Sequence, residues 1–298
     1  MVSNKPSFLK TILLLAILVV LALLVTFSRL DLSSKQNTAK RIQTVMATKS
    51  ASETPAAEPK VASPTAVLVP AQSGRSFAVP ILTYHYIGNN PNPADKLRDN
   101  LEVTPDKFEE EMGYLSKNGY QPISLDTLYA ALKGQANIPP KAVILTFDDG
   151  YVDFYLNAFP ILRKYNLHAI AFIPTGLMNQ GYYLSWAQIK EIDSSGLVVF
   201  QAHSVNHLNL TTLSYSQLLY QLKESKKTLE ANLGKTVNFV AYPYGASNPQ
   251  VWQAANEAGY IGAVGTYFGR TESEGNIYDL PREKIGGGFT LNDFISRL

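Results

Sequence analysis

The feature that most constrains this chain is a repeated alternation of short apolar segments with amphipathic segments, from Pro80 to the C-terminus. The apolar segments read as strands and include AVILTF, AIAFIPT, LVVFQAHS and IGAVGT. Strands that are apolar on both faces and are separated by helices are typical of a parallel sheet covered by helices. About six or seven such units favour a closed or nearly closed barrel over an open sheet, with the chemistry at the C-terminal ends of the strands.

Two of the helical segments carry start signals. Thr104 precedes Pro105 and an acidic first turn, which is the pattern of an N-cap followed by proline at the first helical position. Ser124 is in the cap position of the next helix, and Gly134 marks its end. These signals predict one helix that begins at Pro105 and another that begins after Ser124.

The N-terminal residues predict a membrane anchor. The segment Thr11–Phe27 carries no charge, and with Phe8 and Leu9 it reaches the ~20 residues needed to cross a bilayer. A cleaved signal peptide is the alternative, but SRLDLSS after the apolar run has no A-x-A cleavage pattern. We therefore predict that residues 1–27 form a cytoplasmic tip and a transmembrane signal-anchor; if this segment is cleaved, the protein is secreted.

Residues 28–78 are rich in Ser, Thr, Ala, Pro and Lys, so they are predicted to be a disordered tether. This leaves residues 79–298 as the folded domain. We expect this domain to lie outside the cell, on a protein that crosses the cell membrane once. Residues 1–78 carry a net charge of +6 and residues 79–298 a net charge of −4. A mildly acidic folded part without a basic stripe argues against nucleic acid as a partner.

The chain has no cysteine, so a metal site must use His, Asp or Glu. The segment HSVNH carries His203 and His207, four residues apart, which would place both on one face of a helical turn and let both imidazoles reach one ion. Two imidazoles and one carboxylate leave positions open for water and substrate, as a catalytic Zn²⁺ site requires.

The carboxylates come from TFDDG, where Asp148 and Asp149 follow a predicted strand and precede Gly150. Gly150 lets the chain turn, so that both aspartates can face the barrel rim. If one of them binds a cation, the pair need not repel, and the other is free to accept a proton from water activated by the metal. The bland alternative is that DDG is only a polar turn.

TFDDG, HSVNH and YPYG, in this order along an α/β chain, resemble the polysaccharide deacetylase family, the NodB-homology domain of carbohydrate esterase family 4. The resemblance covers about residues 80–298. It implies a distorted (β/α)7 barrel that hydrolyses N-acetyl or O-acetyl groups on sugar polymers. It also implies a divalent metal, usually Zn²⁺, with Co²⁺ or Ni²⁺ as other possibilities.

The resemblance also implies roles for individual residues. By position, Asp148 corresponds to the general base, and Tyr244 to the residue whose backbone N–H helps to hold the oxyanion. The metal ligands implied by the resemblance are Asp149, His203 and His207.

The sequence departs from the family pattern in two places. The segment VAYPYG has no arginine to pair with the base, and the C-terminal part lacks the histidine of the Leu-x-His motif that acts as general acid. Arg282 and His85 are the candidate replacements. The early YH strand resembles the branch that deacetylates poly-N-acetylglucosamine in biofilms. The alternatives are a packed strand histidine for His85 and a surface ion pair for Arg282.

Aromatic side chains near the motifs suggest a sugar-binding groove. Tyr151 and Tyr242 are the predicted substrate-binding residues, whereas Trp252 and Tyr260 are expected to pack in the core. The function expected from the resemblance is removal of N-acetyl groups from a cell-surface or extracellular N-acetylglucosamine polymer. Two alternatives stay open: an O-acetyl esterase acting on xylan-like polysaccharide, and an inactive membrane-tethered module that binds polysaccharide.

Overall fold

The computed structural model describes residues 74–92 and 94–298. The predicted anchor at residues 1–27 and nearly all of the predicted tether lie outside these residues. Within the described part of the chain, no helix combines the length and apolarity needed to cross a membrane.

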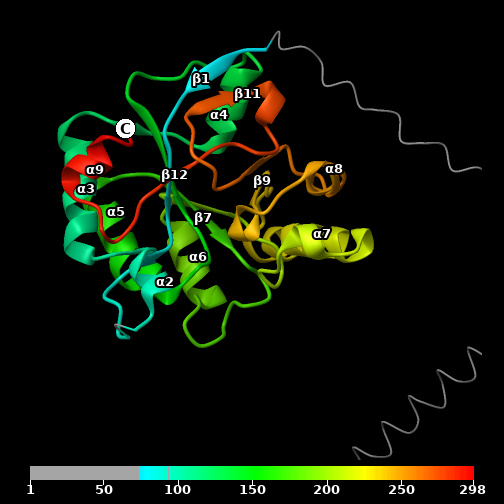
Figure 1. Cartoon of the computed structure of the whole chain (residues 1–298), viewed down its shortest axis with the longest axis horizontal. Helices are drawn as coiled ribbons and strands as arrows, with labels where there is room; N and C mark the ends of the chain where they lie inside the picture. The colour runs from blue at the N-terminus through cyan, green and yellow to red at the C-terminus, as the bar shows by residue number, and fades with distance from the viewer. Residues whose placement is uncertain (1–73, 93) are drawn as a thin grey trace, which may run out of the picture. The chain divides into compact units, whose positions relative to one another are not determined.

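A parallel sheet forms the centre of the folded part (Figure 1). Its seven main strands are hydrogen-bonded in the order β10-β9-β8-β7-β6-β2-β12, and β5 pairs with β6 as a side branch. The bounds of the strands are β2 (Ile81–Tyr84), β5 (Gln121–Pro122), β6 (Ala142–Phe147), β7 (Ala169–Ile173), β8 (Val198–Ala202), β9 (Phe239–Ala241), β10 (Gly262–Val264) and β12 (Glu283–Lys284). Every pairing in this sheet is parallel.

The sheet curls until its two edges reach the same short segment of chain. Leu280 forms a parallel bridge with Val264 in β10. Shortly after Leu280, β12 pairs with β2 at the other edge. The segment 280–284 is therefore shared by both edges, and the predicted α/β fold with a curled parallel sheet is confirmed.

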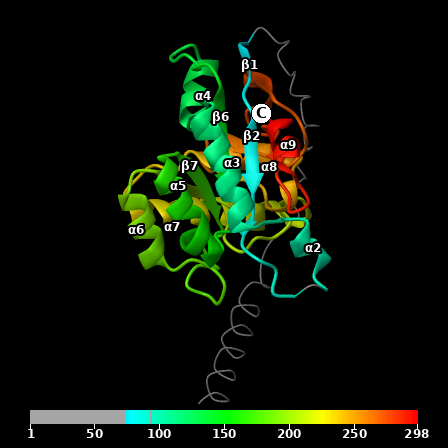
Figure 2. The same ribbon diagram turned by 90° about the vertical axis from the view of Figure 1, so that its left-hand side faces the viewer.

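Helices pack around this sheet, most of them on its outer side and α4 against its concave face (Figures 1 and 2). They are α2 (Lys96–Asp99), α3 (Pro105–Lys117), α4 (Leu125–Leu132), the π-helical segment η1 (Phe154–Ala158), α5 (Phe159–Tyr165), α6 (Trp186–Ser194), α7 (Tyr215–Leu233), α8 (Pro249–Glu257) and α9 (Leu291–Ile295). The predicted caps are confirmed, because the Thr104 hydroxyl accepts from the N–H of Lys107 and the Ser124 hydroxyl from that of Thr127. Short 3₁₀ turns complete the chain at η2 (Leu210–Thr212), η3 (Pro243–Gly245) and η4 (Glu274–Asn276).

Two small sheets lie outside the main one. β3 (Tyr86–Ile87) pairs with β4 (Glu102–Val103) in parallel. β1 (Ser76–Ala78) pairs with β11 (Thr271–Ser273) in antiparallel register. The boundary predicted at residue 79 therefore needs a correction, because residues 76–78 belong to the folded part rather than to the tether.

Alternate residues of each strand face two different cores, since successive side chains of a strand point to opposite faces. One row, on the concave face, packs against the apolar residues of α4; it comprises Ile81, Ile144, Ile170, Phe172, Phe239, Ala241 and Val264. The other row packs with the remaining helices and includes Leu82, Leu145, Ala171 and Val240. A residue that continues the first row past the end of its strand therefore points toward the mouth of the curled sheet.

One buried carboxylate in the second core gives a prediction about stability. Glu111 of α3 is 4% exposed and accepts a hydrogen bond of 2.8 Å from the Tyr84 hydroxyl. Burial raises the pKa of Glu111 from 4.5 to about 7. Its stabilising contribution is complete below pH 4.5 and is lost as the pH rises through about 7, because the folded state then holds an ionised buried group.

We expect Glu111→Gln to remove this loss while it retains an acceptor for Tyr84. The free energy of unfolding of the wild type relative to the variant should fall by about 3 kcal/mol between pH 4 and pH 8. Urea unfolding of both proteins at several pH values measures this difference. A difference that does not change with pH would show that the pKa of Glu111 is the same in the folded and the unfolded state.

Candidate active site and metal centre

Three residues singled out in the sequence continue the concave-face rows beyond the strand ends. His85 follows Thr83 by two positions after β2, Asp148 follows Thr146 after β6, and His203 follows Gln201 after β8. Asp148 and His203 are buried, with 3% and 2% of their surface exposed. Strand geometry thus brings residues from distant parts of the sequence to one mouth.

Asp149, His203 and His207 form a cluster there. The Nε2 atoms of His203 and His207 lie 3.3 Å and 3.0 Å from Oδ1 of Asp149. One ligand atom from each residue falls within 4.8 Å of the others, which makes this a candidate metal centre. The structure thus brings these three side chains together, as the sequence predicted.

The cluster passes a test of fit for a cation. Oδ1 of Asp149 is buried yet has no hydrogen-bond partner among the described residues, although two imidazole nitrogens lie close to it. Zn²⁺ with ligands at about 2.0–2.1 Å in a tetrahedron separates its ligand atoms by roughly 3.3 Å. The observed separations of 3.0 Å and 3.3 Å are near this spacing. The lone pairs of one carboxylate and two imidazoles can therefore meet on one small divalent ion.

A backbone carbonyl fixes the tautomer of the first histidine. Nδ1 of His203 lies 2.7 Å from the carbonyl oxygen of Ala241 at the end of β9. Because a carbonyl only accepts, Nδ1 carries the proton and donates it, so Nε2, which faces Asp149, is the nitrogen that can bind a metal when the ring is neutral. A carbonyl that accepts from the second ring nitrogen is a usual outer partner of a metal-binding histidine.

The HSVNH segment is an irregular turn rather than the predicted helical turn. Ser204 and His207 both have left-handed backbone conformations, with φ of 64° and 53°. The Ser204 hydroxyl accepts a hydrogen bond of 3.1 Å from the N–H of His207. The spacing of four residues does bring both rings to one carboxylate, but through this strained turn.

Arg282 pairs with Asp148 inside the curled sheet. Its two terminal nitrogens donate to the two carboxylate oxygens at 2.8 Å and 2.6 Å. Arg282 is 1% exposed and also donates to the Thr146 hydroxyl and to the carbonyl of Gly265. The alternative of a surface ion pair for Arg282 is wrong, since both partners are buried.

The charges of the two aspartates follow from their partners. Burial alone would raise the pKa of Asp148, but the Arg282 guanidinium outweighs it and leaves the pKa lowered. Burial would likewise raise the pKa of Asp149, but contact with His203 and His207 brings that pKa well below its usual range. Both aspartates are therefore ionised near neutral pH, and each has a separate partner.

His85 completes the group at the mouth. Burial lowers its pKa, against the opposing effect of the charges on Asp148 and Asp149. Its buried Nδ1 atom has no hydrogen-bond partner among the described residues. The alternative of a strand histidine satisfied at Nδ1 by a backbone carbonyl is therefore not what the structure contains.

The predicted tyrosines have three different placements. Tyr244 is 68% exposed, has a left-handed backbone with φ of 61°, and packs its ring edge-to-face against His207 at 4.7 Å. Tyr151 is stacked between two other tyrosine rings, with centroid distances of 4.0 Å to Tyr86 and 5.3 Å to Tyr183. Both faces of the Tyr151 ring are thus covered, so only its edge and hydroxyl can reach a sugar.

The prediction that Tyr242 lines a groove needs a correction. Tyr242 is fully buried, and its hydroxyl donates to the carbonyl of Tyr278. The physical reason is strand parity: Phe239 and Ala241 face the concave core, so Tyr242 points outward into the helical layer.

Sequence reasoning missed the groups that hold the site residues in place. The carbonyl of Ala241 and the hydroxyl of Thr146 were not singled out, although Thr146 could have been found because it lies on the same strand face as Asp148. The stacking partner Tyr183 comes from a loop in which Leu184 donates to the carbonyl of Gly150. No local pattern in the sequence reports that loop contact.

The mouth of the parallel sheet holds an Asp-His-His cluster and an arginine-paired aspartate. Together with the α/β fold, these features indicate the class of hydrolases with a candidate metal centre. Comparison with known proteins gives the family. Residues 135–263 match the family model of polysaccharide deacetylase. This range includes Asp148, Asp149 and both histidines of HSVNH, but not His85 or Arg282.

Individual relatives agree with this match. The chain is 30% identical to YxkH of Bacillus subtilis (strain 168), whose name places it among the polysaccharide deacetylases, over 216 residues that make up 72% of this chain and 74% of that protein. It is 29% identical to the poly-beta-1,6-N-acetyl-D-glucosamine N-deacetylase of Staphylococcus aureus (strain MRSA252), over 61% of this chain and 67% of that protein. Among solved structures, the Streptococcus pyogenes deacetylase PplD, in complex with acetate, is 32% identical with a TM-score of 0.70, over 75% of this chain and 99% of that chain. The chain therefore belongs to the polysaccharide deacetylase family and is an enzyme of that class.

The buried ion pair gives a prediction that does not depend on substrate. We expect Arg282→Met to lower the free energy of unfolding of the metal-free protein by about 3–5 kcal/mol, because it leaves the Asp148 carboxylate buried without its partner. The double variant Asp148→Asn/Arg282→Met should lose less than the sum of the two single variants. Urea unfolding in the presence of a chelator measures all three. Additive losses would show that the two side chains do not stabilise each other.

Proposed function

We propose that this protein is a metal-dependent hydrolase that removes N-acetyl groups from an N-acetylglucosamine polymer at the cell surface or outside the cell. The observation that carries the proposal is the convergence of Asp149, His203 and His207 beside the arginine-paired Asp148. An ion held by three protein ligands keeps positions open for water and substrate, which is the arrangement of a catalytic metal rather than a structural one.

The choice of polymer rests on the relatives and on one residue. The Staphylococcus aureus relative is named for poly-beta-1,6-N-acetyl-D-glucosamine. His85 supports an amide substrate, because an amine is a poor leaving group unless it is protonated as the bond breaks. An O-acetyl ester has a better leaving group and needs such an acid less.

The ligand set favours zinc. Two imidazole nitrogens and one carboxylate oxygen suit Zn²⁺, while Co²⁺ and Ni²⁺ accept similar ligands. When bound, the ion supplies Lewis-acid polarisation of the acetyl carbonyl and a lower pKa for water. Nε2 of His203, Nε2 of His207 and a carboxylate oxygen of Asp149 would hold it.

The remaining steps belong to the chain's own residues. Asp148 accepts a proton from the attacking water, and Arg282 holds the carboxylate in position for that transfer. The backbone N–H of Tyr244 donates to the oxygen of the former carbonyl, which becomes negatively charged. In its protonated form, His85 delivers a proton to the leaving nitrogen. The carbon–nitrogen bond then breaks, and acetate and a free amine are released.

The location of the enzyme stays a prediction from residues 1–78. An exported domain on a membrane anchor would meet a cell-surface polymer directly, and the acetylated polysaccharide would be its partner. The described residues begin at Gly74 and do not bear on this point.

The function is tested by acetate release from four substrates side by side. Residues 74–298, loaded with Zn²⁺, should release acetate from poly-β-1,6-N-acetylglucosamine faster than from chitin oligomers, peptidoglycan or acetylxylan.

Asp148→Asn should bind metal normally but lose activity by a factor of 10² or more, since it lacks the base. His203→Ala should lose metal as well, as measured by elemental analysis. Preference for acetylxylan would favour the O-acetyl esterase, and an Asp148→Asn variant with normal activity would refute the assignment of the base.

The role of His85 is tested by the leaving group. His85→Gln should lower the rate on an N-acetylglucosamine oligomer by about 10²–10⁴-fold, which is the usual contribution of general acid catalysis. The same variant should hydrolyse 4-nitrophenyl acetate within a few-fold of the wild-type rate, because nitrophenolate leaves without protonation. Equal losses on the two substrates would assign His85 to positioning or folding instead of proton donation.

A further inference from the structure

The loop between the two histidines is held from behind by a glutamine that belongs to none of the motifs. We propose that Gln221 of α7 is a positioning residue for the metal centre, which sets the geometry of the His207 loop before the ion binds. This inference rests on the proposed function, because it assumes that Asp149, His203 and His207 hold a cation.

Two hydrogen bonds carry the inference. Oε1 of Gln221 accepts from the N–H of Val205 at 3.0 Å and from the N–H of Asn206 at 2.9 Å. These are consecutive backbone groups within the turn that joins His203 to His207. One side-chain oxygen therefore uses both of its lone pairs on this turn, and Gln221 is itself 4% exposed.

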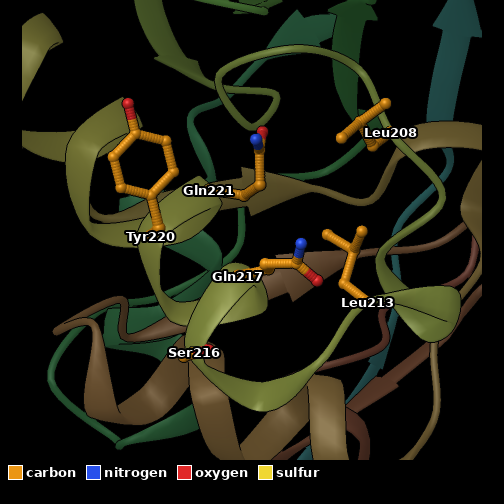
Figure 3. A pocket seen from close by; sticks show the side chains of 6 residues that line it. All are labelled: Leu208, Leu213, Ser216, Gln217, Tyr220 and Gln221. Carbon is orange, nitrogen blue, oxygen red and sulfur yellow. The ribbon is translucent and has the colours of Figure 1, made fainter. Parts of the chain in front are cut away.

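The placement of Gln221 is unusual for a polar side chain in a long helix. Figure 3 shows it beside the loop, at an open pocket lined by Leu208, Leu213, Ser216, Gln217, Tyr220 and Gln221. A buried amide costs free energy unless its groups are paired, so Gln221 is stable there because the loop donates to it. The contact is mutual, since without an acceptor the two N–H groups of the loop would be left unpaired.

The opposite side of the turn is held by backbone. The N–H of Thr175 donates to the carbonyl of Ser204 at 3.1 Å, and the N–H of Gly176 donates to the carbonyl of Val205 at 2.8 Å. A side chain at Gly176 would meet Asn206 and Val205 at 2.7–2.9 Å, so glycine is required for this close approach. The turn is thus clamped between the segment that follows β7 and the side chain of Gln221.

These contacts to the turn matter because the backbone of the turn is strained. Ser204 and His207 are in the left-handed region, which is unfavourable for residues other than glycine. A turn that adopted this shape only when the ion arrives would bind metal more weakly, because part of the binding free energy would be spent on reorganising the turn. Gln221 instead holds the turn in its binding shape beforehand. Outer partners of this kind typically change metal affinity by about 10–100-fold.

The test compares zinc affinity among variants of residues 74–298, measured by competition with a chromophoric chelator. Gln221→Met has a similar volume and no acceptor, and it should weaken zinc binding by about 10–100-fold. Gln221→Glu retains an acceptor oxygen and should bind zinc within threefold of the wild type. If Gln221→Met does not fold, Gln221→Asn, which keeps the amide but is one methylene shorter, takes its place with the same expected loss.

A matched control lies one turn earlier on the same helix. Gln217 lines the same pocket, but its Oε1 accepts from the N–H of Ser214 at the start of α7 and, among the described residues, forms no hydrogen bond to the loop. Gln217→Met should lower thermal stability without changing zinc affinity. This separates a loss of helix stability from a loss of loop geometry.

The outcomes distinguish the two proposals. Wild-type protein that binds no zinc would overturn the proposed function and this inference with it. Wild-type protein that binds zinc, with a Gln221→Met variant that binds equally well, would overturn this inference alone. A Gln221→Glu variant that loses as much affinity as Gln221→Met would also overturn it, because the acceptor oxygen would then not be the cause.

Discussion

The ion pair between Arg282 and Asp148 links the closure of the sheet to the chemistry at its mouth. Arg282 lies in the segment 280–284, which both edges of the sheet share. Burying two charges costs several kcal/mol for each ion, and this is offset only when the remaining donors are also satisfied. Here the guanidinium donates to both oxygens of Asp148, to the Thr146 hydroxyl and to the carbonyl of Gly265. One interaction therefore holds the closing segment and orients Asp148, the proposed general base.

The two adjacent aspartates can coexist because the backbone separates them. Asp148 continues the concave row of β6 and meets Arg282, whereas Asp149 has a left-handed φ of 73° and turns toward the histidines. Each carboxylate thus has a positive or polarisable partner of its own. The bound cation would neutralise Asp149 and leave Asp148 as the base, a division of roles that neither residue type nor sequence neighbourhood could assign by itself.

Much of the fold and of the site could be predicted because both depend on short-range rules. Helix starts at Pro105 and after Ser124 follow from capping, and the aspartates and histidines follow from their places after apolar strands. The misplacement of Tyr242 was avoidable, since strand parity assigns it to the outer face once Ala241 faces inward. The clamp from Gln221 and the carbonyl of Ala241 could not be predicted, because they join segments that are 15 or more residues apart without a local pattern. The left-handed turn of HSVNH could not be predicted either, because the segment contains no glycine and Ser204 is not a residue type typical of that conformation.

Backbone strain is concentrated at the mouth of the sheet, where the candidate site lies, and not at the opposite end. Seven non-glycine residues of the described chain have a positive φ, and four of them, Asp149, Ser204, His207 and Tyr244, lie after β6, β8 and β9 at the mouth. Strain of this kind persists only where the surroundings determine the conformation. At the other end, α4 packs the side chains of Leu125, Leu128 and Leu132 on the concave core. The free energy gained there by packing offsets the strain at the mouth, where the same backbone turns bring three ligand atoms to one point.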